Sequence, residues 1–488
     1  MTNDRPITRR SAFKTGAAFA AGVAAFRVIS EPANAQDVRR FDGQPAFDPA
    51  RRILLKGGTI ISMDTNVGDL AQGDLLIEGK KIVSIGRDIG AADAQVIDAR
   101  DTIIVPGFVD CHRHSWEAPL RRINPNSPTI ADYSNATHLS FAKAYRPQDH
   151  YVANYLTAIG CIDAGITCVI DNSHNSRSAD HSDAAVEGLM DSGVRAVHAS
   201  GPPTSGDWAH QWPQDLERLQ KKYFSSTDQL VTLRMFSGPI RENWAVARRL
   251  GLRITTEGAA ALDPLAQDKL VGPDNTFNHC GALPERTWQI FVETGANINV
   301  CPRSDAQYAL GEGICALQHA WDHGIKPGFS IDNETSYGGD MFTEMRVAFY
   351  LQRAVAHNRR FSGDANPPQP LMIRDILYCA TMGGARCAGL DDKIGSLAPG
   401  KEADLLVIRA DEINLYPSNN AIGTVVQAAE RSNIDTVIIG GRVRKYGGKV
   451  VGLDMNRLKS AVEESRSHLF TAAGYRPDMF AELLPKLS

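Results

Sequence analysis

The middle of the chain, from about residue 107 to residue 390, alternates short apolar runs with amphipathic segments. Eight runs have the length and composition of buried strands: VPGFVD, GITCVID, VRAVHASG, LVTLRMFSG, LRITTEG, TFNHCG, ANINVCP and KPGFSID. Between them lie helix-like segments such as HSDAAVEGLMDSG and LPERTWQIFVETG. This alternation predicts parallel strands, and eight such units predict a (β/α)8 TIM barrel. A doubly wound open sheet is the structural alternative, but no GxGxxG or Walker-type motif supports nucleotide binding.

Short β-like runs flank this middle on both sides. RILLKGGTII, GDLLIEGKKIVSIG and AQVIDARDTIIVPG precede it, and GKEADLLVI and IDTVIIGGRVRKYGGKVVG follow it. We expect both ends to pair into one small, discontinuous β-sandwich domain outside the barrel. The expected organisation is a first sandwich part at 36–106, the barrel at 107–392, a second sandwich part at 393–453 and a C-terminal helical tail at 454–488.

Residues 1–35 resemble a twin-arginine-type signal peptide. Arg9 and Arg10 precede a weakly apolar stretch of small residues, and Ala33-Asn34-Ala35 has the form of a cleavage site. The alternative is a disordered N-terminal tail. The apolar stretch is far shorter than the roughly 20 residues of a membrane span. The sequence therefore predicts a periplasmic protein that uses the twin-arginine export machinery, is cleaved near Ala35 and has no membrane span.

The composition limits the classes of partner molecule that we expect. The formal charge of -4 provides no electrostatic reason to expect nucleic acid. The eight cysteines form no CxxC pair, and buried free thiols are the expected state. A small-molecule substrate is the expected partner, and the oligomeric state, including a homo-oligomer, stays open.

Polar residues collect where the predicted strands end, which in a barrel of this kind is the mouth that carries the chemistry. His112 and His114 end the first strand and, being two apart, point the same way. His279 ends the sixth strand and Asp332 the eighth. Imidazoles and a carboxylate gathered at one mouth are the ligands of a divalent cation such as Zn²⁺ or Fe²⁺.

Four motifs carry a family resemblance: VPGFVDCHRH, FNHC, SIDN and IGSLAPGKEADLLVI. From about Ile53 to Gly452 the chain resembles the amidohydrolase superfamily, in its cytosine deaminase, guanine deaminase and triazine hydrolase branch. The resemblance implies a (β/α)8 barrel with a small β-sandwich. It also implies metal ligation by His112 and His114, contact of His279 with the substrate, the metal or its bound water, and a ligand and proton-shuttle role for Asp332.

The fifth strand departs from the family pattern. The family has a third histidine ligand there, whereas this chain reads LRITTEG, and by register Thr256 stands in the ligand position. Three interpretations follow. One divalent metal ion, zinc or iron, is held by His112, His114, Asp332 and either His279 or Glu257. Alternatively, a metal-poor lyase, isomerase or hydrolase uses Glu257, His279 and Asp332 as acids and bases. The third is a non-catalytic small-molecule binder.

Further residues are candidates for substrate binding. Trp116 follows the first strand, and the loop motif GDWAHQW contains Trp208, His210 and Trp212, which suggests an aromatic or heterocyclic ligand. The remaining candidates are Asn172, His174, His198 and Arg303. The sequence predicts an enzyme that hydrolyses a carbon–nitrogen bond of a small molecule, by deamination or amide or ring hydrolysis, through a metal-activated water.

Overall fold

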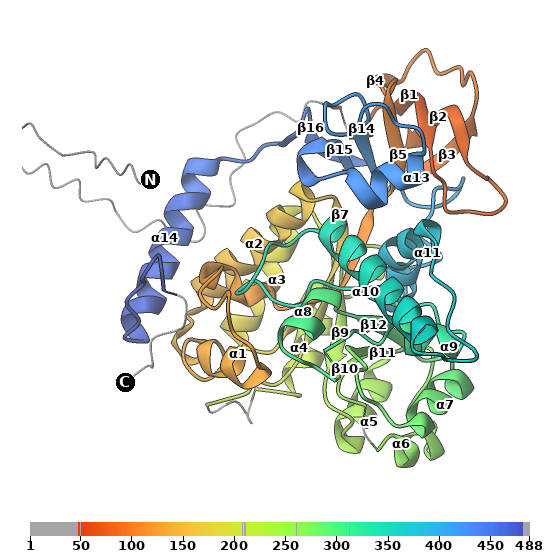
Figure 1. Cartoon of the computed structure of the whole chain (residues 1–488). Coiled ribbons are helices and arrows are strands. Elements are labelled where there is room, and N and C mark those ends of the chain that lie inside the picture. Colours follow the sequence, from red (N-terminus) through yellow and green to blue (C-terminus); the bar gives the residue numbers. More distant parts are fainter. Residues whose placement is uncertain are drawn as a thin grey trace, which may run out of the picture.

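The computed structural model describes residues 47–481, except residues 49, 207, 209, 210, 260 and 312. Two bodies of structure dominate this part of the chain: a barrel of parallel strands surrounded by helices, and a mixed sheet at one side of it (Figure 1). The predicted signal peptide, residues 1–35, lies outside the described residues.

The eight predicted strands of the middle segment are present, and they are hydrogen-bonded in chain order. All neighbouring pairs are parallel. The strands are β6 Phe108–Arg113, β7 Ile166–Ser173, β8 Arg195–Ser200, β9 Val231–Phe236, β10 Ile254–Glu257, β11 Asn275–Asn278, β12 Asn297–Val300 and β13 Gly328–Phe329. The prediction of a (β/α)8 barrel is confirmed.

The first and last strands meet just beyond β13. His114 N donates to Asp332 O and Asp332 N donates to His112 O, both at 2.8 Å. This parallel bridge between Arg113 and Asp332 closes the barrel at its C-terminal mouth. The closure places Asp332 directly beside the two histidines of β6.

Helices follow the barrel strands and cover their outer face (Figure 1). Three of them, α3, α5 and α7, end at glycines in the left-handed conformation, which stops the helix and turns the chain into the next strand. The helices are α1 Ile130–Ala136, α2 Pro147–Asp163, α3 Ala179–Ser192, α4 Asp215–Tyr223, α5 Arg241–Leu250, α6 Asp263–Gln267, α7 Glu285–Thr294, α8 Pro302–Gln307, α9 Leu317–Asp322, α10 Met341–Phe361, α11 Ile373–Tyr378, α12 Gly384–Ala388, α13 Ala421–Gly423 and α14 Met455–Ala472. Short 3-10 and π segments cover Ser115–Leu120, Ala142–Ala144, Cys379–Gly383, Thr424–Ala428 and Arg431–Asn433.

Both ends of the described chain contribute to one nine-stranded mixed sheet. Its strands are β1 Ile53–Ile60, β2 Leu70–Glu78, β3 Lys81–Gly86, β4 Gln95–Asp98, β5 Thr102–Pro106, β14 Leu405–Arg409, β15 Ile434–Ile439, β16 Arg442–Tyr446 and β17 Lys449–Val450. β5 pairs antiparallel with β14, and this ladder joins the early and late segments. The expected small domain built from two distant pieces of chain is therefore present.

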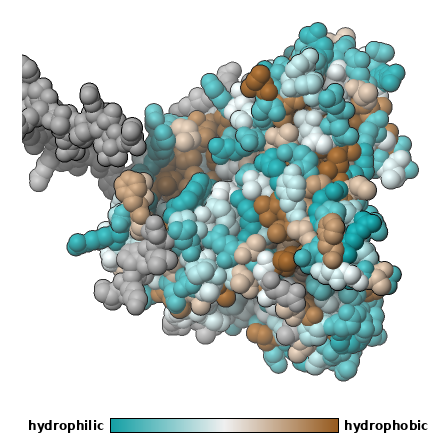
Figure 2. All heavy atoms as spheres, viewed as in Figure 1, coloured by the Kyte–Doolittle hydropathy of each residue, from teal (hydrophilic) through white to brown (hydrophobic). Residues whose placement is uncertain are grey.

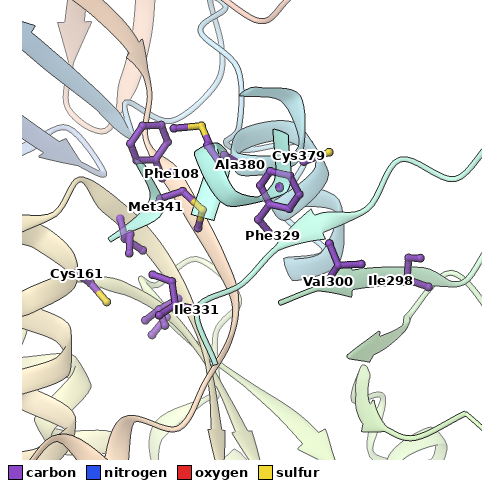
Figure 3. Packing of buried hydrophobic residues seen from close by; sticks show 14 of the residues in the cluster. Phe108, Cys161, Ile298, Val300, Phe329, Ile331, Met341, Cys379 and Ala380 are labelled. Carbon is purple, nitrogen blue, oxygen red and sulfur yellow. The ribbon is translucent and has the colours of Figure 1, made fainter. Parts of the chain in front are cut away.

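A large apolar cluster packs behind the strands that close the barrel (Figure 3). Phe108 of β6, Phe329 of β13, the following Ile331 and Met341 of α10 are all fully buried in it. Phe108 also contacts Phe342 edge to face, with ring centroids 5.1 Å apart. Burial of such side chains contributes about 1.5–3 kcal/mol each. This packing positions β6 and the segment after β13, which together carry the polar residues of the mouth.

The helix α14 returns from the sheet to the barrel. Leu469 and Phe470 of α14 are buried in a cluster with Trp116, Leu120 and Phe141, which lie in the segments after β6. The predicted C-terminal helical tail is thus a packed element that supports the residues next to the barrel mouth.

Two expectations about the surface and the cysteines can be compared with the structure. All eight cysteines are free and buried, as expected. Within the described residues, no helix combines the length and the apolar character needed to cross a membrane. On the face seen in Figure 2, hydrophobic atoms form small groups separated by hydrophilic ones.

A buried ion-pair group joins the barrel to the sheet. Arg195 at the start of β8 donates from Nε and Nη2 to the two carboxylate oxygens of Asp404, at 2.8 and 2.9 Å, and from Nη2 to Glu402 at 2.7 Å. All three side chains are at most 5% exposed. Arg195 therefore neutralises two carboxylates that have little access to water.

Replacing Arg195 with alanine is expected to lower the free energy of unfolding by about 3–5 kcal/mol, because it leaves the buried carboxylate of Asp404 without the counter-charge that Arg195 supplies. Chemical denaturation followed by circular dichroism measures this change. Arg100→Ala is the matched control, since Arg100 pairs with Asp98 in full contact with solvent and should change stability far less. Equal losses in the two variants would contradict this role for Arg195.

Candidate metal centre

The barrel mouth is built on the alternation of side chains at the end of β6. His112 and His114 point to the same side, with ring centroids 4.6 Å apart, while Arg113 between them points the opposite way to Asp110 and Glu334. Both imidazoles are buried. The predicted pairing of these two histidines is present in the structure.

Two carboxylate oxygens lie beside the two imidazole nitrogens, which gives four potential ligand atoms. Asp332 Oδ1 lies 3.0 Å from His112 Nε2 and 3.1 Å from His114 Nε2. Glu257 Oε1 lies 3.2 Å from His112 Nε2 and 3.7 Å from His114 Nε2. The four atoms come from β6, the end of β10 and the segment after β13. Two imidazole nitrogens and two carboxylate oxygens are a suitable donor set for a divalent cation.

Glu257, not Thr256, faces the two histidines of β6. Thr255 Oγ1 accepts from Arg234 at 3.1 Å, so Thr255 and Glu257 lie on one face of β10 and Thr256 lies on the other. The predicted ligand position of Thr256 does not agree with this orientation, because Thr256 faces away from the two histidines. Glu257 Oε1 is buried without a hydrogen-bond partner, although the side chain as a whole is 39% exposed. A buried, unpaired carboxylate oxygen facing two imidazoles fits a cation between them.

A chain of side chains from Trp116 fixes the protonation of His114. Trp116 Nε1, which can only donate, lies 3.4 Å from His174 Nε2, and His174 Nε2 lies 2.9 Å from His114 Nδ1. Burial lowers the pKa of His174 well below its usual value, so His174 is neutral and its Nε2 accepts. His114 Nδ1 therefore carries a proton, and in neutral His114 the Nε2 lone pair is free to bind a cation.

Asparagines surround the other ring nitrogen of His112. The amides of Asn172 and Asn278 both contact His112 Nδ1, the second at 2.9 Å, and Asn299 Nδ2 donates to Asn278 Oδ1 at 2.7 Å. Asn172 Oδ1 is buried and has no partner. Because Asn278 Oδ1 already accepts from Asn299, the amide nitrogen of Asn278 donates to His112 Nδ1, and His112 Nε2 faces Asp332 Oδ1 at 3.0 Å.

The charge state of the mouth without a cation follows from these contacts. Burial lowers the pKa of His114, but Asp332 and Glu257 outweigh burial and raise it to about 9. Burial opposes ionisation of Asp332, but hydrogen bonds with His112 and His114 hold the pKa of Asp332 well below its usual value. Ser304 donates a hydrogen bond to Asp332 Oδ2 from the other side. Asp332 is therefore an ionised carboxylate with one oxygen directed at the two histidines.

His279 lies beside this group. Its ring centroid is 5.2 Å from that of His112, and one of its ring nitrogens lies within 4.8 Å of the ligand atoms of His112 and Asp332. Asp305 Oδ1 contacts His279 Nδ1 at 2.7 Å. Burial lowers the pKa of His279, but its contacts with Cys301 and with the carboxyl group of Asp305 raise it well above its usual value. His279 is thus a protonated imidazole at the edge of the donor set.

Two predicted substrate residues lie elsewhere. His198 is fully buried, and its Nδ1 contacts Asp171 Oδ2 at 3.0 Å. Since Asn172 faces His112, Asp171 and its partner His198 face away from the barrel interior. Arg303 turns to α10, where its Nε donates to Glu344 at 2.5 Å and its Nη2 donates to Gly338 O at 2.7 Å. Both side chains bind partners inside the protein and therefore point away from the barrel mouth.

Most of the remaining residues predicted to bind substrate contact other protein side chains. Asn172 and His174 bind the ring nitrogens of the two β6 histidines, and Trp116 is 1% exposed and supports His174. Trp208 is half-buried, with its ring centroid 6.5 Å from that of Trp212. His210 lies outside the described residues.

Three residues of the site are not among those predicted from the sequence: Asp305, Asn278 and Asn299. Asp305 lies in α8, just after β12, and orients His279. Asn278 and Asn299 end or interrupt otherwise apolar strand runs, at positions whose side chains face the barrel interior. A polar amide within a buried strand is the signal that could have identified both asparagines.

The fold and the donor set define a (β/α)8 barrel protein with a candidate divalent-metal centre at its C-terminal mouth. The model of the amidohydrolase family matches residues 255–444, from β10 to β16. Both the structure and this match agree with the resemblance to the amidohydrolase superfamily noted in the sequence.

Curated relatives align along almost their entire length. A 5-methylthioadenosine/S-adenosylhomocysteine deaminase of Pelotomaculum thermopropionicum is 27% identical over 442 residues, which cover 84% of this chain and 97% of the relative. A 5'-deoxyadenosine deaminase of Methanothermobacter thermautotrophicus is 25% identical, with 86% of this chain and 98% of the relative covered.

Solved structures share the fold. An adenosine deaminase from Xanthomonas campestris with bound zinc has a TM-score of 0.74 at 21% identity, covering 86% of this chain and 98% of that one. A mutant atrazine chlorohydrolase from Arthrobacter aurescens, complexed with zinc and atraton, has a TM-score of 0.73 at 22% identity, covering 85% of this chain and 100% of that one.

Proposed function

We propose that the protein is a metal-dependent hydrolase that replaces an amino group, or a comparable leaving group, on a small nitrogen heterocycle. The observation that carries the proposal is the convergence of His112 Nε2, His114 Nε2, Glu257 Oε1 and Asp332 Oδ1 at the mouth of the barrel. The names of the relatives support the reaction class, since they describe deaminases of adenosine-type compounds and a chlorohydrolase of a triazine.

The four donor atoms would hold one divalent cation, and zinc is the proposed metal. Mixed nitrogen and oxygen ligation suits zinc, and two neighbouring structures contain it. A cation of this kind supplies a nucleophile at neutral pH, because it lowers the pKa of bound water to about 7.

Asp332 is the proposed proton carrier. Its depressed pKa keeps it ionised and able to accept the proton of the attacking water, and Ser304 holds its second oxygen in place. The same carboxyl group then passes that proton to the departing amine. The mouth needs only one mobile carboxyl group for both steps.

His279 is the proposed electrophilic residue. Protonated and held by Asp305, it can donate a hydrogen bond from Nε2 to a ring nitrogen or another heteroatom of the substrate. Negative charge that develops on a heterocycle during attack would be stabilised by this donor. The side chain of Glu257, which is partly exposed, is the other acidic group that a substrate can reach.

A metal-poor lyase or isomerase is the second candidate. The same His–carboxylate contacts form a closed ion-pair group without a cation, as the raised pKa of His114 indicates. In that case Glu257, His279 and Asp332 would move protons directly.

The metal dependence of ammonia release distinguishes the metal-dependent hydrolase from the metal-poor lyase or isomerase. The purified protein, loaded with zinc, is incubated with adenosine, 5'-deoxyadenosine, 5'-methylthioadenosine and S-adenosylhomocysteine, while atrazine is tested by chloride release. We expect turnover of at least one compound, loss of that turnover on treatment with a chelator, and recovery when zinc is restored. Turnover that survives the chelator, with less than about 0.1 metal per chain, would instead support the second candidate.

We also propose that the protein is exported to the periplasm in the folded state. The support is the sequence alone: the arginine pair, the apolar stretch and the cleavage site within residues 1–35. Cell fractionation with an Arg9→Lys/Arg10→Lys variant tests the proposal, and an unchanged periplasmic yield would contradict the twin-arginine route.

A further inference from the structure

A second cavity lies behind β6, on the side away from the candidate metal centre. Its volume is about 420 Å³, and it is bordered by the end of β6, by α2, by the start of α10 and by residues 430–432 that precede β15. Arg113 lines it, and Arg113 points away from the donor atoms of His112 and His114. The cavity and the metal centre therefore lie on opposite faces of the same strand.

Arginines dominate the wall of this cavity. Five arginines and three carboxylates line it, and two of these arginines also contact carboxylates beyond the wall: Arg113 pairs with Asp110 at 2.7 Å and Arg431 with Asp163 at 3.3 Å. The arginines are Arg113, Arg121, Arg122, Arg346 and Arg431. Guanidinium groups bind phosphate and carboxylate through paired N–H donors, so a concentration of them favours an anionic ligand.

The three carboxylates are already engaged. Glu334 accepts from Arg113 Nη1 at 2.7 Å and from Arg121 Nε at 2.6 Å. Asp340 caps the start of α10 by accepting from Thr343 N at 2.8 Å, and Glu430 caps the short helix that follows it. Among the described residues, none of the three forms a hydrogen bond or ion pair with Arg122 or Arg346.

Several guanidinium donors remain available. Arg113 is 1% exposed, and its Nη2 is buried without a hydrogen-bond partner. Gly339 leaves this guanidinium open to the cavity, because a Cβ there would lie 2.6 Å from Arg113 Nη1. A buried donor without a partner costs about 1–3 kcal/mol, which an anion in the cavity would recover.

Two further arginines have no carboxylate partner among the described residues. Arg346 donates from Nη1 to Ala429 O at 2.9 Å. The pKa of Arg122 is lowered by partial burial and by the charges of Arg121 and Arg431. This repulsion between neighbouring guanidinium groups would be relieved by a dianion.

We propose that this arginine cavity binds a phosphate group carried by a small organic molecule. A phosphate ester would pair with the guanidinium groups of Arg122 and Arg346, and the volume of the cavity exceeds the needs of a free ion and lies in the range of small-molecule sites. The ligand would contact β6 from behind, next to the strand positions that carry His112 and His114.

Thermal unfolding of the zinc-loaded protein tests this site without reference to catalysis. The probes are glucose 6-phosphate, inorganic phosphate and unphosphorylated glucose, at constant ionic strength. We expect glucose 6-phosphate near 100 times its Kd to raise Tm by about 3 °C, with no effect of glucose. A shift with inorganic phosphate alone would assign the site to the free ion and overturn the ester.

Variants at the two available arginines locate the binding. Arg122→Gln/Arg346→Gln is expected to abolish the shift and to weaken binding, measured by calorimetry, at least about 30-fold, because it removes two charge-assisted contacts. Arg360→Gln, an exposed arginine near the end of α10, is the matched control and should keep the full shift. No shift with any phosphate, or an equal shift in both variants, would overturn the proposal.

Discussion

Replacing Asp332 with asparagine is expected to lower kcat/KM for hydrolysis by about 10³-fold. The change keeps the size of the side chain but removes the carboxylate that carries the proton and contacts both β6 histidines. Asparagine also tolerates the backbone at this position, where φ is 75°, so the fold should be retained. Steady-state kinetics on the compound with the highest turnover, together with Tm, measures both effects.

The matched control is Asp391→Asn, which removes an exposed carboxylate outside the barrel mouth. It should leave kcat/KM unchanged within about twofold, as expected of a surface substitution. Full turnover in the Asp332→Asn variant would contradict the proposed role of Asp332 as the proton carrier.

Replacing Glu257 with glutamine is expected to reduce zinc affinity by about 100-fold or more, since even the loss of residues that only support a ligand costs 10–100-fold. A neutral amide oxygen cannot supply the charge that the carboxylate places 3.2 Å from His112 Nε2. Metal content per chain after gel filtration, measured by mass spectrometry, reports the loss.

The Thr256→Val variant tests whether Thr256 or Glu257 is the residue of β10 that binds the metal. It removes the hydroxyl at nearly constant volume and should leave the zinc content unchanged, because Thr256 faces away from the donor atoms. Glu257→His, which returns a third imidazole to the mouth, should retain zinc. Loss of zinc in Thr256→Val together with its retention in Glu257→Gln would show that Thr256 is the ligand.

The strand order and the first histidine pair could be predicted from the sequence. Eight apolar runs separated by amphipathic segments leave few alternatives to a barrel, and the spacing of His112 and His114 places them on one side whatever the detailed register. Asp332 could be located because the carboxyl ends of all strands in such a barrel meet at one mouth.

The difference at β10 has a geometric cause. The strand is only four residues long, and a shift of one residue exchanges its two faces, so register alone could not decide between Thr256 and Glu257. The contact between Thr255 and Arg234, a residue of β9, settles the orientation. Such a contact joins two strands and is invisible in either sequence segment.

The misassigned substrate residues reflect competition between partners. Arg303 and Ser304 are neighbours, yet the long side chain pairs with Glu344 while the short hydroxyl reaches Asp332. His198 was expected at the mouth because it lies on a barrel strand, but Asp171 on the adjacent strand holds it on the outer face. Which partner a polar side chain finds depends on tertiary packing, and a single sequence does not contain that information.

The position of α14 affects when the site can form during synthesis. The segment after β6 that contains Trp116 is made more than 300 residues before Leu469 and Phe470, which pack in the same cluster as Trp116. During synthesis, His114 and His174 are therefore present long before α14 is made. Only α14 completes the packing around Trp116, which contacts His174 and through it His114. Metal binding of full strength would require α14, and removal of α14 would disturb the metal centre through Trp116, which lies more than 300 residues earlier in the sequence.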